Sequence, residues 1–410
     1  MRLPTVPPTA GLPLQAADLR PWGSENFAQA LAHWLGVTEV QLECSGTSAL
    51  MVALRTLKAR QPQRSEVIAP AYTCPLVALA VAQCGLHLRL CDLRADALDM
   101  DSMCLQALCS EQTLAVLPTH LCGRVADVAA AVLCARAVGA YVIEDAAQAL
   151  GARVDHQSVG LQGDIGFFSL AVGKGLSTFE GGVLISQDAE LARALQDHSR
   201  RHTQPQRWWE LRRSVELLGY AALYRPHGLH LAYGKPLQKS LARCDWVEAA
   251  GDDFDDFIPQ HTLGRWRQRV GARALQRLRD FQQQTRAQAM ARMAQLESLG
   301  LEVLGDAASD AQGIWPVILI RMPDMQSRNA LLKAQWANGC GLSLPFVHVL
   351  PDYGRYQHVL AFAQQDTVTQ ARDWAQRLVA VSNSPWLDSS RFAGLLQDFQ
   401  QAICSQNQST

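Results

Sequence analysis

The sequence has 410 residues, of which 48% are hydrophobic and 18% charged, enough apolar material for one large core and a second, smaller one. With 37 Lys and Arg against 38 Asp and Glu, the formal net charge is −1, so no long-range field favours nucleic acid or an anionic membrane. These values predict two domains in an enzyme-sized protein whose partners are small molecules.

Neither a secretion signal nor a membrane-spanning helix is predicted. The N-terminal stretch MRLPTVPPTAGLPL contains several prolines in place of an unbroken apolar core, and no apolar run reaches roughly 18 residues. The cysteines lie in apolar surroundings, without a CxxC pair or metal-ligand spacing, so we expect reduced, mostly buried thiols and no metal site. This cysteine usage favours a cytoplasmic protein.

The first half of the sequence alternates short β-branched runs with alanine-rich runs, which is the pattern of βαβ units in a mainly parallel sheet. The predicted strands are residues 66–70, 88–93, 114–120, 140–146 and 181–188. The predicted helices are residues 48–60, 74–85 and 127–139, and the last two end at the C-cap signals Gly85 and Gly139.

A segment from about residue 196 to residue 258 differs in composition from what precedes it. It is rich in Arg, Trp and Tyr and ends with the acidic run GDDFDDF. We interpret it as a helical insertion that packs on a partner subunit, or alternatively as a surface-attachment element. Its apolar residues come in short pieces, which favours the first interpretation. Trp208 and Trp209 either stack on a nucleotide or pack the insertion, and packing is favoured.

The remaining sequence predicts a second, smaller domain. Residues 266–300 form a predicted long helix, followed by a strand at 314–322 and a terminal helix at 391–403. The predicted division is a large domain over residues 1–285, which includes the inserted segment, and a small C-terminal domain over residues 286–410.

Lys174 is the single lysine of the stretch GDIGFFSLAVGKGLSTFEGGVLISQD. A lone lysine is usually solvated, but these glycine-rich and apolar flanks predict an ammonium group close to buried backbone. Desolvation generally lowers the pKa of a lysine, and a neutral amine attacks carbonyls to form a Schiff base. The stretch therefore predicts a nucleophilic lysine.

Two further motifs supply chemistry that complements such a lysine. Asp145 follows an apolar strand, at the edge where open α/β sheets bind ligands, although it could equally cap a following helix. An ionised aspartate there can pair with a pyridinium nitrogen. The turn SGTS at residues 45–48 opens a helix whose free N–H groups suit a phosphate, or is an ordinary N-cap. Phosphate cradle, acid and lysine are the three contacts that pyridoxal phosphate (PLP) requires.

In this order and spacing, the motifs resemble the DegT/DnrJ/EryC1/StrS aminotransferases, the sugar-aminotransferase branch of the fold type I PLP enzymes. The resemblance runs from about Asn26 to Ala402. Its strongest segments are ECSGTSALMVAL, EVIAPAYTCPLVALAVAQCGLHLRLCDL, AVLPTHLCGRVADVAAAVLCARAVGAYVIEDAAQALGA, the lysine stretch and SPWLDSSRFAGLLQDF. It implies an α/β fold with a mixed, mainly parallel seven-stranded sheet in the large domain and a smaller α+β domain. It also implies a homodimer whose partner chain completes each site.

The resemblance assigns roles to individual positions. Lys174 would bind PLP covalently and move protons, Asp145 would pair with the pyridine nitrogen, and Gln148 would approach the ring hydroxyl. The further cofactor contacts would be Gly46, Thr47, Ser48 and Ser169 at the phosphate, and Gln260 in place of an asparagine that reaches a neighbouring subunit. Relatives that act as sugar dehydratases have histidine at the position of Lys174, so the lysine favours transamination.

Other positions depart from the family pattern or are open to two interpretations. Where members commonly place an aromatic residue over the cofactor, this chain has Cys74, so Tyr72 or a residue from elsewhere would cover that face. Tyr72, His120 and His348 are candidate substrate contacts. Both histidines are also consistent with structural roles in packing.

The predicted reaction transfers an amino group from an amino acid, with L-glutamate the expected donor, to a keto-sugar that is most simply nucleotide-linked. PLP and pyridoxamine phosphate would alternate in a ping-pong cycle. One alternative is the same chemistry on a non-sugar ketone or aldehyde in specialised biosynthesis. The other is a catalytically silent PLP-binding sensor or scaffold, against which the retained lysine, aspartate, glutamine and phosphate turn argue.

Overall fold

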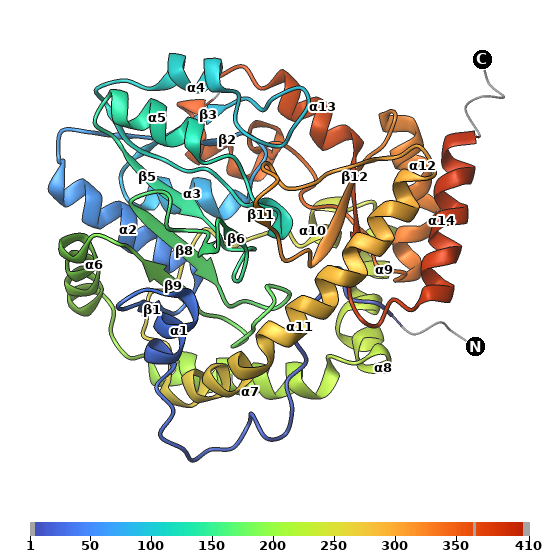
Figure 1. The fold of residues 1–410 in the computed structure, drawn as a ribbon, viewed down its shortest axis with the longest axis horizontal. Helices are drawn as coiled ribbons and strands as arrows, with labels where there is room; N and C mark the ends of the chain where they lie inside the picture. The colour runs from blue at the N-terminus through green and yellow to red at the C-terminus, as the bar shows by residue number, and fades with distance from the viewer. Residues whose placement is uncertain (1–4, 364–365, 405–410) are drawn as a thin grey trace.

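The computed structural model describes residues 5–363 and 366–404. A larger part around a central sheet and a smaller part around a second sheet lie on either side of helix α11 (Arg265–Glu297), which crosses the molecule diagonally in Figure 1. This helix is continuous over 33 residues, and the expected domain boundary at residue 285 falls inside it. The exact division into domains therefore stays a prediction.

The central sheet has seven strands in the order β1-β9-β8-β5-β4-β2-β3. Neighbours from β8 to β3 are parallel, whereas β9 is antiparallel to both β8 and β1. The strands are β1 (Gln41–Glu43), β2 (Glu66–Pro70), β3 (His87–Cys91), β4 (Thr113–Val116), β5 (Tyr141–Asp145), β8 (Ile165–Ser169) and β9 (Gly182–Ile185). The α/β class and the mixed, mainly parallel seven-stranded sheet are thus confirmed.

Helices α2 (Gly46–Arg60), α3 (Pro75–Gln83) and α5 (Ala129–Ala137) correspond to the three helices that the sequence predicts. The structure adds α1 (Phe27–Leu35), α4 (Ser102–Leu108) and α6 (Ala189–His202), which were not predicted. Gly85 and Gly139 follow α3 and α5 with positive φ, a conformation in which glycine ends helices at low cost. The strand expected at 114–120 is shorter, because Pro118 has no N–H to continue the ladder.

The inserted segment is helical and lies along the bottom and lower right of Figure 1. Its elements are α7 (Arg207–Leu223), α8 (Pro226–Leu229), a π-helical turn (His230–Gly234), α9 (Lys235–Ala242) and α10 (Trp246–Ala250). An irregular stretch that contains the acidic run then leads back to α11.

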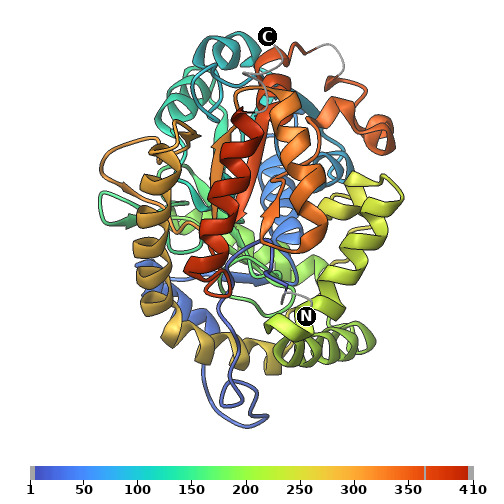
Figure 2. The same cartoon turned by 90° about the vertical axis from the view of Figure 1, so that its right-hand side faces the viewer.

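The smaller part is built on a four-stranded antiparallel sheet in the order β10-β12-β14-β13. Its strands are β10 (Glu302–Val303), β12 (Val317–Arg321), β13 (Leu342–Ser343) and β14 (Leu378–Ser382), and its helices are α12 (Met325–Gln335), α13 (Thr369–Arg377) and α14 (Ser389–Cys404). Figure 2 shows α12 in orange and α14 in red side by side on its outer surface.

Short elements complete the described chain. A small antiparallel sheet joins β6 (Arg153–Val154), β7 (Gln157–Ser158) and β11 (Ala311–Gln312), and 3₁₀ turns cover Leu121–Gly123, Trp336–Asn338, Leu350–Asp352 and Gly354–Val359. Among the helices described, none is both long and apolar enough to cross a bilayer. Of the eleven cysteines, all free thiols, only Cys244 and Cys404 are exposed.

Candidate active site

A cavity of about 980 Å³ lies at the carboxyl ends of the central strands, where open α/β sheets bind ligands. Two walls face it. We call the first the strand-end wall; it contains Gly46, Thr47, Asp145, Gln148, Ser169 and Lys174. We call the second the loop wall; it consists of residues 252 and 254–258 from the acidic stretch and residues 343–346 of the smaller part.

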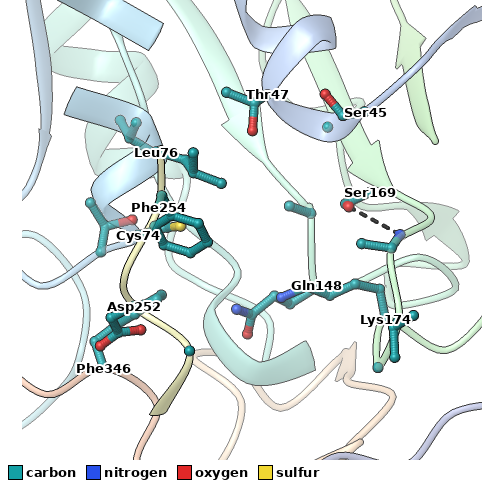
Figure 3. A pocket seen from close by; sticks show the side chains of 18 of the residues that line it. Ser45, Thr47, Cys74, Leu76, Gln148, Ser169, Lys174, Asp252, Phe254 and Phe346 are labelled. Atoms are coloured by element: carbon teal, nitrogen blue, oxygen red, sulfur yellow. Dashed lines mark hydrogen bonds between the residues drawn. The ribbon is translucent and has the colours of Figure 1, made fainter. Parts of the chain in front are cut away.

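Lys174 is half-buried in a turn between β8 and β9 and lines the cavity. Gly173 and Gly175 on either side have φ of 81° and 84°, so the backbone here requires the left-handed region that glycine tolerates. Figure 3 shows the side chain of Lys174 extending toward Gln148 in the middle of the cavity. The glycine-rich flanks therefore serve to turn the chain and direct the amine inward.

Asp145 is the last residue of β5 and is only 6% exposed. The N–H of Ala147 donates to its Oδ1 at 3.1 Å, and residues 146–151 form turns, so Asp145 does not cap a helix. Burial raises the pKa of this carboxyl, an effect that the charge of Lys174 opposes. A cationic ring N–H placed beside Asp145 would restore its ionised form.

The start of α2 forms the third corner of the strand-end wall. Ser45 caps the helix by accepting the N–H of Ser48 at 3.0 Å, and Gly46 and Thr47 line the cavity. A Cβ atom on Gly46 would lie 2.9 Å from the Cβ of Ser169, so only glycine lets the helix start approach β8 this closely. The free N–H groups of the first helical turn therefore face a space suited to a phosphate.

Gln148 completes this wall. Its Oε1 accepts the N–H of Cys122 at 2.7 Å, which orients the side chain and leaves the amide nitrogen for a ligand. A buried carboxylate, an inward-directed amine, an oriented amide and a helix start together match the polar groups of PLP. On these observations, the residues present fit this cofactor.

The other predicted site residues lie in different surroundings. Ser48 lies behind the cavity lining, and its hydroxyl contacts Glu43 at 3.5 Å. Gln260 also lies outside the lining and accepts from Arg55 at 2.7 Å. The role of Ser48 in cofactor binding therefore stays a prediction. So does the role of Gln260 in the site of a neighbouring subunit.

His120 lines the cavity but is almost fully buried, with both ring nitrogens engaged. Its Nδ1 accepts the N–H of Ala126 at 3.1 Å, so its Nε2 carries the proton and donates to Glu144 at 3.0 Å. Burial raises the pKa of Glu144, but hydrogen bonds from His120 and from backbone N–H groups outweigh it and lower the pKa overall. These contacts favour the structural interpretation of His120.

Tyr72 and His348 support the loop wall from behind. The hydroxyl of Tyr72 donates to the carbonyl oxygen of Phe346 at 2.9 Å and accepts the N–H of the same residue at 3.2 Å. His348 packs edge-on against Tyr353, and burial lowers its pKa. Neither Tyr72 nor His348 belongs to the cavity lining.

The loop wall contributes residues that the sequence analysis did not single out. Phe254 and Cys74 both line the cavity and overlap in the view of Figure 3. Cys74 is the position at which the family pattern has an aromatic residue and this chain has a thiol. Burial raises the pKa of the Cys74 thiol to about 12. The sequence signals for this wall were the acidic run and the candidate His348, which follows residues 343–346, and neither reveals which side chains face the cavity.

Asp252 brings a second buried carboxylate to the cavity and is 3% exposed. Its Oδ2 accepts hydrogen bonds from the Tyr353 hydroxyl at 2.5 Å and from the N–H of Val347 at 2.8 Å. Burial raises its pKa to about 6, although these two hydrogen bonds and the charge of Lys174 act in the opposite direction. The loop wall is therefore anchored to the smaller part through Asp252.

Comparison with known proteins relates this arrangement to one family. Residues 22–223 match the model of the DegT/DnrJ/EryC1/StrS aminotransferase family. A UDP-N-acetyl-3-dehydro-alpha-D-glucosamine 3-aminotransferase of Acidithiobacillus ferrooxidans is 40% identical over 37% of this chain and 41% of its own length. An L-glutamine:2-deoxy-scyllo-inosose aminotransferase of Streptoalloteichus tenebrarius is 35% identical over 42% of this chain and 40% of its own length. The chain thus spans less than half the length of these curated relatives.

The fold is shared over a longer stretch. A putative sugar aminotransferase from Streptococcus pneumoniae, solved in its PLP form, superposes with a TM-score of 0.74 at 16% identity. This match covers 98% of the present chain and 99% of the other. The likeness extends to the smaller part and establishes the same overall fold.

Proposed function

Over residues 22–223 this chain belongs to the DegT/DnrJ/EryC1/StrS aminotransferase family, and we propose that it is a PLP-dependent enzyme that transfers an amino group from an amino acid to a keto-sugar. One observation carries the proposal: Lys174, Asp145 and the start of α2 meet in a single cavity. In the proposed complex, these groups would bind the aldehyde, the ring nitrogen and the phosphate of PLP.

When bound, PLP supplies an electron sink for the bond changes at the substrate carbon. Lys174 would hold the cofactor and then move a proton to and from that carbon as acid and base. Asp145, ionised, would keep the proton on the ring nitrogen, and Gln148 would donate to the ring oxygen.

The acceptor we propose is a nucleotide-linked keto-sugar, with L-glutamate as the donor. The cavity volume of about 980 Å³ lies at the upper end of the range for ligand sites, which leaves room for a large substrate beside a cofactor. The relative named for UDP-N-acetyl-3-dehydroglucosamine supports this class. The relative named for 2-deoxy-scyllo-inosose shows that a carbocyclic ketone must be included in any test.

Absorption spectroscopy of the purified, PLP-loaded protein tests this function. L-glutamate should abolish the band of the lysine-bound cofactor, and a nucleotide-linked keto-sugar should restore it. Restoration by 2-deoxy-scyllo-inosose alone would reassign the acceptor. A band that does not respond to any amino acid would identify a silent PLP binder, and a band that survives both borohydride and Lys174→Ala would overturn the assignment of the lysine.

The assembly and location follow from the same proposal. We propose a homodimer, in which the partner chain completes each site, working in the cytoplasm. Sedimentation equilibrium should give twice the mass of the chain. A monomer with full activity would refute the shared site.

A further inference from the structure

Helix α7 of the inserted segment exposes a continuous apolar stripe on its outer face. Four large apolar residues repeat at intervals of three and four, so they share one side of the helix. They are Trp208, Leu211, Val215 and Leu218, with exposures of 85%, 54%, 60% and 47%. A contiguous apolar surface that is exposed in this way is typical of an interaction site.

The opposite face of α7 already anchors the helix to the protein. Leu217 and Tyr220 are buried in the core of the larger part, and Glu210 pairs with Arg267 at 2.6 Å. Trp209 and Arg213 line the cavity from this inner side. The outer stripe is therefore not needed to hold α7 in place and is available to a partner.

The exposed charges around the stripe have one sign. At 100° per residue, Arg207 and Arg212 flank the stripe, although Arg212 also lines the cavity and pairs with Glu216 at 3.0 Å. Glu210 points away from the stripe and pairs with Arg267. From residue 200 to residue 243, all of which the structure describes, every exposed acidic or basic side chain other than histidine is basic. These side chains are Arg200, Arg201, Arg207, Arg212, Arg225, Lys235, Lys239 and Arg243.

Most of these cations are not neutralised within the protein. Arg200, Arg212 and Arg243 form ion pairs with Asp197, Glu216 and Glu248. The others have no ion pair among the described residues. The whole-chain charge of −1 thus conceals a segment in which apolar and cationic surface occur together.

A second copy of the chain fits this surface poorly. A two-fold interface places the same patch against itself, so the unpaired cations Arg201, Arg207, Arg225, Lys235 and Lys239 would be brought toward one another. An anionic lipid surface satisfies both features at once, because the apolar stripe enters the headgroup boundary while the cations contact lipid phosphates.

We propose that residues 200–243 form a peripheral docking surface for an anionic lipid bilayer, with the outer face of α7 as the inserted element. The cavity borders the inner face of the same helix, so docking would place the site close to the membrane surface. This proposal does not rest on the proposed reaction. If the protein binds vesicles but lacks transaminase activity, the docking surface stands and the proposed function is wrong.

Co-sedimentation of the full-length, PLP-loaded protein with vesicles tests the proposal. We expect binding to vesicles of phosphatidylcholine and phosphatidylglycerol in equal parts, and none to phosphatidylcholine alone. The binding should fall steeply toward 1 M salt, where the screening length is about 3 Å. Absence of binding to the anionic vesicles at low salt would overturn the proposal.

Two pairs of variants locate the surface. Lys235→Gln/Lys239→Gln should lower the vesicle partition coefficient about 30-fold, whereas Lys333→Gln on α12, also an exposed helix lysine, should not. Leu211→Gln/Leu218→Gln should lower it about tenfold or more, whereas Leu133→Gln on α5, which is 74% exposed, should not. Matched melting curves and cofactor spectra show that the variants are folded.

Equal weakening by variants and controls would overturn the assignment of this surface. A second result would also overturn it. If the wild-type protein does not bind vesicles and Leu211→Gln/Leu218→Gln splits its assembly into smaller species, the stripe is an interface with a second copy of the chain.

Discussion

The two walls of the cavity are built from different kinds of chain. Each member of the strand-end wall follows a strand or opens a helix within a few residues of a recognisable signal, such as the strand before Asp145 or the glycines around Lys174. The loop wall comes from irregular segments about 90 residues apart, joined through Asp252 and Val347. One wall is a product of local sequence, and the other is a product of packing.

This difference suggests a division of labour. The strand-end wall holds the groups that fit the reactive parts of PLP, whereas the loop wall places Phe254, Asp252 and the exposed acids on another side of the same cavity. Substitutions in the first wall should therefore damage chemistry, and substitutions in the second should change cofactor retention, stability and pH dependence.

The largest effect is expected from Lys174→Ala. Without the amine, neither covalent attachment nor proton transfer is possible, so the amino-group transfer should fall by at least about 10⁴-fold. Mass spectrometry after borohydride treatment should show cofactor mass on the wild-type chain and none on the variant. Lys333→Ala on α12 is the control, and cofactor mass retained on the Lys174 variant would contradict the assignment.

Asp145→Asn should lower the rate by about 10²–10³-fold, because a neutral amide no longer stabilises a protonated ring nitrogen. Nitrogen NMR of labelled cofactor should report the lost proton. Glu144→Gln is the neighbouring control: its carboxylate serves His120 and backbone N–H groups, so this change should reduce stability and leave the ring nitrogen protonated. An unprotonated ring nitrogen in the wild type would refute the role of Asp145.

Asp252→Asn should alter the pH dependence of stability. Burial raises the pKa of Asp252 from 3.8 to about 6, so the folded protein binds this proton more tightly than the unfolded chain does. Wild-type stability therefore declines, relative to the variant, as pH rises through that window. Denaturant titrations at several pH values should show a relative change of about 3 kcal/mol. Asp253→Asn, at the exposed neighbouring position, is the matched control.

The smallest effect is expected from Phe254→Ala. If this ring covers the cofactor in place of an aromatic residue at Cys74, its removal should raise the dissociation constant of PLP about tenfold, as measured by dialysis and absorbance. Phe254→Tyr should preserve retention, and Cys74→Ala should change it little. A larger loss from Cys74→Ala than from Phe254→Ala would reverse the assignment.

Much of the architecture was predictable because its signals are short. The alternation of strands and helices, the turns at Gly85 and Gly139 and the long helix near residues 266–300 all depend on local periodicity and caps, and the structure agrees with them within a few residues. Strands β1 and β8 lay outside the predicted set. β8 is buried at every position, so it lacks the alternation that identifies a half-exposed strand.

Candidate positions were less predictable when their role depended on a distant contact. His120 matches a motif, yet its ring is engaged by Ala126 and Glu144. Tyr72 was a plausible cover for the cofactor, but its hydroxyl is bound to the backbone of Phe346. Helix α7 has apolar residues on both of its faces. Which face remains exposed depends on which face packs against the rest of the protein.

Local signals predicted the alternation of strands and helices and singled out Lys174 and Asp145, because backbone propensity and strand-end geometry act over a few residues, whereas the seven-stranded sheet and the candidate Gln148 came from the resemblance to the family. The loop wall, the engaged state of His120 and the surface formed by residues 200–243 emerged only from the folded chain. Burial, ion pairing and exposure depend on neighbours far away in the sequence, and local patterns do not contain that information.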